Sequence, residues 1–192
     1  MSQIKVNSII PVSGVPTGGG GGIIQVITNT TQDSTGSISL AAAASNETNY
    51  VDITNQNVTI TPTSSSSKIL ISFAQMGELS ISGHQLCYIL KRAISGGATT
   101  QIKGAAAGNR PRIFVPASIS YDRDETSTPE MGNCAGYLDS PNTTSAVTYT
   151  VQAGMNSNNS GTYFYNRTVQ DTDSVNDYER GLSWITVMEV SA

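Results

Sequence analysis

After residue 22 the chain consists of short apolar runs, many of which alternate apolar and polar residues. Alternation places successive side chains on opposite faces of an extended strand. Each run is therefore predicted to be a β-strand, and Pro116 is predicted to mark an edge or a bulge. The runs are Ile23–Thr28, Tyr50–Ile53, Asn57–Pro62, Lys68–Met76, His84–Ile94, Thr99–Gly104, Arg112–Tyr121, Asn133–Asp139, Ala146–Gly154, Thr162–Val169 and Leu182–Val190.

Polar turn residues separate these runs, and helical periodicity is nearly absent. Asn29–Gly36 is turn-like, and Ala41–Ala44 is the only plausible helical turn. The run Thr162–Val169 is expected to pair with Ala146–Gly154 as a hairpin. The apolar run Leu182–Val190 is expected to lie centrally in a sheet. Strands at this spacing without interleaved helices predict an all-β fold, an antiparallel β-sandwich of jelly-roll type over residues 23–192.

Residues 1–17 form a segment of a different kind. Its apolar residues are interspersed with Pro11 and Pro16, which exclude a regular helix. Such a segment cannot bury itself, so we expect an extended arm that docks on a partner surface. The residues predicted to anchor this arm are Ile4, Val6, Ile9, Ile10, Val12 and Val15.

A run of five glycines, Gly18, Gly19, Gly20, Gly21 and Gly22, follows the arm. A phosphate-binding P-loop would need a Lys-Ser or Lys-Thr after the last glycine, and a dinucleotide turn would need a following helix. Neither pattern is present. Polyglycine is highly flexible, so the run is predicted to be a hinge between the arm and the sandwich.

Composition narrows the range of functions. Only 12% of residues are charged, the net charge is −4, and the basic residues form no stripe, which argues against nucleic-acid binding. No apolar run approaches the roughly 18 residues of a membrane span, and the first residues lack the apolar core of a secretory signal. We therefore expect no membrane insertion and no cofactor.

Three residues could in principle support nucleophilic or zinc chemistry. His84 is the only histidine, and no GxSxG motif accompanies it. Cys87 and Cys134 form no metal-binding pattern, and two buried free thiols are the simplest interpretation, although a disulfide stays open. Catalysis is therefore not expected.

Two acidic segments are alternatives to solvated loops. Their residues are Asp122, Asp124 and Glu125, followed later by Asp171, Asp173 and Asp177. The second segment begins like a calcium loop but lacks the glycine and the bidentate glutamate of that motif. Paired carboxylates could also serve glycoside hydrolysis, which would make the chain a polysaccharide depolymerase.

Aromatic residues cluster near the predicted C-terminal hairpin. Tyr163, Tyr165 and Tyr178, close in sequence to several asparagines, could form an adhesive surface for sugars or proteins. The alternative is packing on the inner face of a strand, because half of any sandwich strand points inward.

Four stretches carry a resemblance to a known family. They are the opening MSQIKVNSIIPVSGVP, VTITPTSSSSKILI at 58–71, LDSPNTTSAVTYTVQA at 138–153 and the closing WITVMEV. Together they resemble tail fibre-like virion proteins of marine and cyanobacterial tailed phages. Residues 34–49 and 122–132 lie outside the resemblance.

The resemblance implies a non-enzymatic structural protein of a bacteriophage virion, a cyanophage for example, assembled in the host cytoplasm. It implies a short tail fibre or spike, with an arm that docks on other virion proteins. The β-sandwich head, similar to the tumour-necrosis-factor-like sandwich, would be a homotrimer for host attachment through a surface glycan or protein. A capsid decoration or head-fibre protein is the alternative, and a depolymerase is a weaker one.

Overall fold

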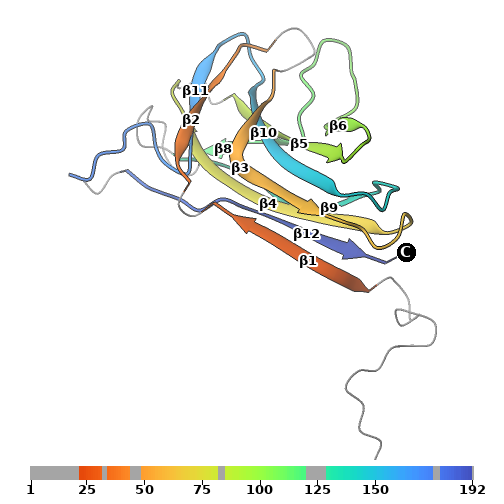
Figure 1. The fold of residues 1–192 in the computed structure, drawn as a ribbon. Coiled ribbons are helices and arrows are strands. Elements are labelled where there is room, and N and C mark those ends of the chain that lie inside the picture. The colour runs from red at the N-terminus through yellow and green to blue at the C-terminus, as the bar shows by residue number, and fades with distance from the viewer. Residues whose placement is uncertain are drawn as a thin grey trace, which may run out of the picture.

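The computed structural model describes residues 22–31, 34–43, 49–81, 85–119, 129–174 and 178–191. Within these ranges the chain forms strands and no helix (Figure 1). The strands are β1 (Ile23–Thr30), β2 (Gly36–Leu40), β3 (Val51–Ile60), β4 (Lys68–Leu79), β5 (Leu86–Ile94), β6 (Thr99–Ile102), β7 (Val115–Pro116), β8 (Ser118–Ile119), β9 (Glu130–Asp139), β10 (Val147–Met155), β11 (Gly161–Tyr165) and β12 (Trp184–Val190).

The strands form two antiparallel sheets. In the seven-stranded sheet, β12 lies between β1 and β4, and β9 pairs with the opposite edge of β4. The end of β4 also pairs with β11, which carries β2, while β8 pairs with β9. The five-stranded sheet has the order β3-β10-β5-β6, and β7 pairs with β5. The predicted all-β antiparallel sandwich is confirmed, and so is the central position of the last strand.

The predicted hairpin between Ala146–Gly154 and Thr162–Val169 is wrong. Strand β10 lies in the five-stranded sheet, where β3 and β5 occupy both of its edges. No edge of β10 is left for β11, which pairs instead with β2 and β4. The polar residues between β10 and β11 therefore carry the chain from one sheet to the other.

Three local predictions also differ from the structure. Gly36–Leu40 is a strand, although it had been partly assigned to a turn, and residues 41–43 are not helical. Ala44 lies outside the described residues. Tyr50–Ile53 and Asn57–Pro62 belong to one strand, β3, whose pairing with β10 shifts register near Asn55. Asn55 has a φ of 62°, a left-handed conformation that asparagine tolerates better than most residues.

Pro116 marks a change of sheet. Cys87 in β5 pairs with Pro116, and two residues later Ser118 pairs with Met131 in β9 of the other sheet. A proline lacks the N–H that a continuous ladder needs, so the strand cannot continue through it in one sheet. The expected interruption is confirmed.

The core lies between the sheets and is formed by the inward half of each strand. Alternate residues of β4, β10 and β12, among them Phe73, Tyr149 and Val187, are fully buried. Tyr88 and Tyr163 meet edge-to-face across the sheets, with ring centroids 6.1 Å apart. The hydroxyl of Tyr88 donates to that of Tyr163 at 3.1 Å, so these large side chains are buried with their polar ends bonded.

A buried ion pair links the two sheets. Arg92 of β5 donates from one Nη1 to both carboxylate oxygens of Asp139 at the end of β9, at 2.8 and 2.9 Å. The hydroxyl of Tyr149 donates to the same carboxylate at 2.7 Å. Asp139 is therefore a three-way connection between β5, β9 and β10, and the loss of this carboxylate would leave the guanidinium uncompensated.

Asn166 holds the start of the connection between β11 and β12. Its Nδ2 donates to the hydroxyl and carbonyl of Thr31, at 2.8 and 3.0 Å, and to the carbonyl of Ser34 at 2.7 Å. Its Oδ1 accepts from the hydroxyl of Ser183, and its backbone N–H donates to the carbonyl of Met76. The residue thus ties the end of β1 to β4 and to the start of β12.

At the other end of β1, Glu189 of β12 connects β1 to the loop that follows β3. Its buried carboxylate accepts hydrogen bonds from Gln25 of β1 and from the backbone and hydroxyl of Thr63, at 2.6 to 2.7 Å. Burial alone would raise the pKa of Glu189, but these hydrogen bonds outweigh it and lower the pKa to about 2. Gln25 also donates to the carbonyl of Thr61, so β1 is attached to the loop that follows β3.

Two aspartates provide a matched test of these contacts. Asp139→Ala should lower the free energy of unfolding by about 3–5 kcal/mol, because it leaves the largely buried Arg92 guanidinium and the buried Tyr149 hydroxyl without their acceptor. Asp52→Ala removes a half-exposed partner of Lys91 and of the Gln152 amide and should cost less, about 1–2 kcal/mol. Urea unfolding followed by fluorescence of Trp184 measures both. Equal losses in the two variants would show that Asp139 is not the connection described.

Candidate functional site

The predicted arm and most of the predicted hinge lie outside the described residues. This holds for Ile4, Val6, Ile9, Ile10, Val12 and Val15, and for Gly18, Gly19, Gly20 and Gly21. Gly22 is the first described residue, and its carbonyl accepts a hydrogen bond from the N–H of Ser191 at 3.0 Å. The freedom predicted for the glycine run therefore does not extend to Gly22, which the sheet already holds.

The predicted adhesive surface at Tyr163 and Tyr165 is wrong for this chain. Tyr163 is fully buried and Tyr165 is 7% exposed, because both side chains point inward from β11. The Tyr163 hydroxyl donates to the carbonyl of Met76 and accepts from Gln75 and Tyr88. Tyr178 is partly buried and stays a candidate contact residue.

The residues considered for chemistry do not gather into a catalytic arrangement within the described part of the chain. Cys87 and Cys134 are both free and buried. Burial raises the pKa of Cys87 to about 11, so the thiol stays protonated and is a poor nucleophile. His84, Asp122, Asp124, Glu125 and Asp177 lie outside the described residues.

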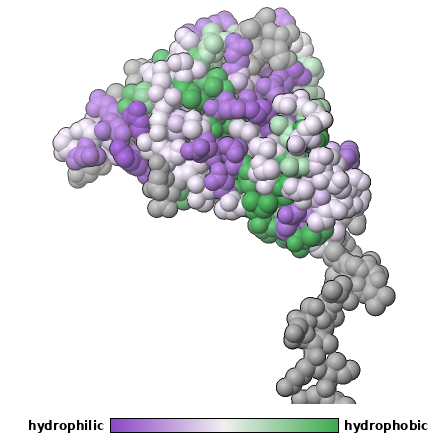
Figure 2. All heavy atoms as spheres, viewed as in Figure 1, coloured by the Kyte–Doolittle hydropathy of each residue, from purple (hydrophilic) through white to green (hydrophobic). Residues whose placement is uncertain are grey.

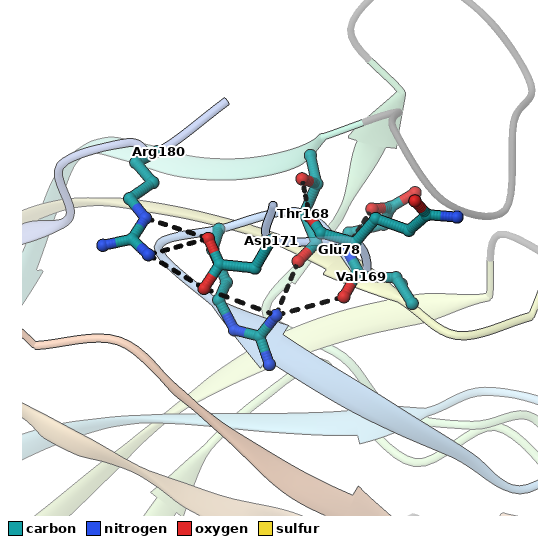
Figure 3. A network of polar contacts seen from close by, with 7 residues as sticks. Glu78, Thr168, Val169, Asp171 and Arg180 are labelled. Carbon is teal, nitrogen blue, oxygen red and sulfur yellow. Dashed lines mark hydrogen bonds and ion pairs between the residues drawn. The ribbon is translucent and has the colours of Figure 1, made fainter. Parts of the chain in front are cut away.

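The other acidic residues considered for calcium are in the connection between β11 and β12. Asp171 receives two parallel bonds from Arg180, from Nε and Nη2, each at 2.9 Å, and Arg167 lies 3.8 Å away (Figure 3). Arg167 also stacks over the ring of Phe164, 4.4 Å from its centroid. Asp171 is thus engaged by cations of the chain, and the described residues contain no group of three or more potential metal ligands.

Glu78 fixes the same connection to the sheet. Its Oε2 accepts the N–H of Val169 at 2.5 Å, and Figure 3 shows this contact beside Asp171 and Arg180. Glu130 of β9 pairs with Gly77 of β4, the residue that precedes Glu78. Burial and the nearby Glu78 raise the pKa of Glu130 to about 7.

The most distinctive exposed feature is a row of apolar side chains across the outer face of the seven-stranded sheet. We call it the apolar row, and it consists of Val26, Met188, Leu70 and Leu138. These residues are direct partners in the β-ladders, one each from β1, β12, β4 and β9. Val26 is 55% exposed and Leu138 is 54% exposed.

The surroundings of the apolar row are small or apolar. Ile23 and Ile24 are exposed at the start of β1, and Val190 lies beside them at the end of β12. Green spheres gather at this lower right end of the body in Figure 2, where β1 begins and β12 ends in Figure 1. Two further rows run parallel to the apolar row on the same face of β1, β12 and β4. The nearer row consists of Thr28, Thr186 and Ser72, and the next one consists of Thr30, Trp184 and Ala74.

Charge is nearly absent from this face. Among the described outward-facing residues of β1, β12, β4 and β9 that are at least partly exposed, Lys68 is the only ionisable side chain, and it donates to the hydroxyl of Ser140. Glu78 has the same orientation on β4 but is buried beneath the β11–β12 connection. Contiguous exposed apolar surface of this kind typically marks an interaction site. A face without charge can also approach a copy of itself without like-charge repulsion.

The sequence contained a signal for this face. In WITVMEV, both the inward residues Ile185 and Val187 and the outward residues Trp184 and Met188 are apolar. A strand with one solvated face would alternate with polar residues, so apolar residues on both faces indicate that both are covered. Leu70 and Leu138 could not be assigned to the row from sequence, because their pairing depends on the register between β4 and β9.

Comparison with known protein families and with curated proteins finds no match to this chain. No helix in the described residues is long and apolar enough to cross a membrane.

Glu130 gives a pH-dependent test of the buried acidic pair. The pKa of Glu130 is raised from 4.5 to about 7 in the folded state, so the folded protein binds this proton more tightly than the unfolded protein does. The free energy of unfolding should therefore fall as the pH rises from about 4.5 to 7. Glu130→Gln should remove this fall, worth on the order of 3 kcal/mol, and should have little effect on stability near pH 4. Chemical unfolding of both proteins at pH 4 and 8 measures it. Equal changes of stability between pH 4 and 8 in the wild type and in Glu130→Gln would contradict the assignment, because other carboxyls such as Glu189 contribute to both proteins alike.

Proposed function

We propose that the chain is a non-enzymatic structural protein of a tailed-phage virion, a short tail fibre or spike. Its sandwich head associates with copies of itself through the outer face of the seven-stranded sheet. The observation that carries the self-association is the apolar row, which crosses four adjacent strands on a nearly uncharged face. The virion assignment rests on the resemblance of the sequence to tail fibre-like proteins.

The strand order supports the finer description of the head as a jelly roll. From β3 to β5 the chain changes sheet at every strand, and it changes again from β9 to β10 and from β10 to β11. The neighbours β1-β12-β4-β9 and β3-β10-β5 bring together strands that are far apart in sequence. This order is typical of double-sheet jelly rolls, which are common in viral proteins and lectins.

Charge supports a second copy of this chain as the occupant of the apolar row. The chain carries a net charge of −4, so two copies repel each other unless their contact lies on a charge-poor surface. The outward faces of β1, β12, β4 and β9 supply such a surface. Burial of exposed Val26 and Leu138 side chains stabilises the contact by the ordinary hydrophobic effect. If this face lies about a threefold axis shared by three copies, the contact would give the homotrimer that the resemblance implies.

The remaining parts agree with attachment at one end and display at the other. β1 begins at Ile23 at the lower right of the body, and the β11–β12 connection projects at its left (Figure 1). An anchor placed before β1 would leave the opposite end of the head free to meet the host. Display of several copies raises weak binding through effective concentration.

Leu138→Asp tests the self-association. The substitution places a charge in the apolar contact of each copy, and a cost of about 3 kcal/mol per contact would weaken association roughly 100-fold. Analytical ultracentrifugation should show an oligomer for the wild-type chain and mainly monomer for the variant. Thr59→Asp adds the same charge to the outer face of the other sheet and should leave the oligomer unchanged. A wild-type monomer at high micromolar concentration would overturn the proposal.

Removal of residues 1–17 tests the anchor. The shortened protein should still form the oligomer but should no longer be incorporated into virions during complementation of a phage that lacks the gene. Normal incorporation would show that the arm is not the anchor.

The copy number of the full chain, measured by quantitative mass spectrometry of virions, separates a tail position from a capsid one, because decoration of a capsid requires hundreds of copies.

A further inference from the structure

Large apolar side chains are exposed at the point where the chain enters the head. Ile23 is 60% exposed and Ile24 is 40% exposed, and Ile23 pairs with Val190 at the end of β12. We call these three residues the base patch. The start of β1 and the end of β12, which carry them, lie at the lower right of the body in Figure 1, where green spheres gather in Figure 2.

A β-bulge accounts for the exposure of two neighbouring isoleucines. The register between β1 and β12 shifts between Ile23 and Gln25, so Ile24 has no partner in this ladder. In a regular strand, successive side chains point to opposite faces, and one of the two isoleucines would be directed into the core. Bulges redirect side chains, and this one leaves both isoleucines at the surface.

The base patch is held in place by the sheet before any partner binds. The carbonyl of Gly22 accepts the N–H of Ser191 at 3.0 Å. On the other side of the patch, Gln25 donates to Glu189 at 2.6 Å and to the carbonyl of Thr61 at 2.8 Å. A surface that is already ordered loses little conformational entropy when a partner covers it.

Uncharged loops lie at the same end of the sandwich as the base patch. Residues 61–67, after β3, and residues 140–146, after β9, contain no ionisable side chain. Lys68, the strand partner of Val190, donates to the hydroxyl of Ser140 in the second loop. An apolar centre with uncharged polar surroundings is typical of protein–protein interfaces, whose cores are depleted of charge.

The length of the chain before β1 indicates which protein covers the base patch. Val15, the last residue predicted to anchor the arm, is eight positions before Ile23, and five of the intervening residues are glycines. Eight residues span at most about 29 Å in any conformation. A protein that holds Val15 therefore has its surface within this distance of the base patch.

We propose that the base patch is a second contact between the head and the particle protein that holds the arm. The inference rests on the proposed function, because it requires the arm to be the anchor. Once the arm is bound, the short tether keeps the patch at a high effective concentration beside the partner. A contact that is too weak to act alone then strengthens the attachment and limits the tilting of the head.

Binding of the full chain to particles from a phage that lacks the gene tests the contact, with co-sedimentation as the measurement. Ile24→Asp should weaken binding about tenfold or more, because it places a charge against an apolar surface. Ile24→Ala adds no charge and should weaken binding about threefold or more. Leu182→Asp is the matched control, because Leu182 is 48% exposed in the β11–β12 connection, and it should bind like the wild type.

A longer glycine run tests the role of the tether. Extension from five to twenty glycines should lower the effective concentration of the base patch about eightfold, by the −3/2 power of the tether length. Binding should weaken by up to this factor. In Ile24→Asp the same extension should have almost no further effect, because the patch no longer contributes to binding.

The outcomes separate this inference from the proposed function. If removal of residues 1–17 abolishes binding while Ile24→Asp and the lengthened protein bind like the wild type, the base patch is overturned and the anchor stands. If Ile24→Asp sediments as a monomer without particles, the patch is also overturned, because Ile24 then belongs to the contact between copies. Unchanged binding without residues 1–17, or no binding by the wild type, overturns the anchor and this inference with it.

Discussion

Strand β4 is the element on which the other parts of the structure depend. Its backbone pairs with β12 and β11 on one edge and with β9 on the other, so three strands of one sheet are fixed relative to a single twelve-residue segment. Phe73 on its inner face fills the core, while Leu70 on its outer face lies in the apolar row. Its final residues carry Glu78, which holds the connection between β11 and β12. The register of β4 therefore determines which side chains are in the core, which are in the apolar row and which hold the β11–β12 connection. A shift of one residue would exchange the inner and outer faces of the strand.

Much of this architecture follows from local pattern. The alternation in Lys68–Met76 and Ala146–Gly154 identifies strands because burial of one face requires that period. The apolar composition of the last run indicates a central position, which β12 has. Local pattern fails where pairing is decided at a distance. β10 and β11 are adjacent in sequence and separated by turn residues, yet the edges of β10 are taken by strands from elsewhere in the chain.

The candidate surfaces were less accessible to prediction than the fold. Tyr163 is of a residue type that is common in binding sites, which suggested an adhesive role. Side chains alternate along β11, however, and Tyr163 occupies an inward position and is buried in the core. Val26, Met188, Leu70 and Leu138 come from four separate runs, and only the register of three ladders places them side by side. The sequence shows the chemical character of each residue, but only the three-dimensional structure shows which residues lie side by side on a surface.

The attachment of β1 has a mechanical consequence. Gly22 is bonded to Ser191, and β1 then pairs with β12 along its whole length to Thr30. A force that enters at Gly22 and runs along the strand would load these backbone bonds together, in shear, instead of opening them one after another. Gln25, held by Glu189 and by the carbonyl of Thr61, adds a side-chain link to the other sheet near the point of loading. For a fibre head of the kind proposed, this arrangement would resist unfolding under tension between a particle and a surface.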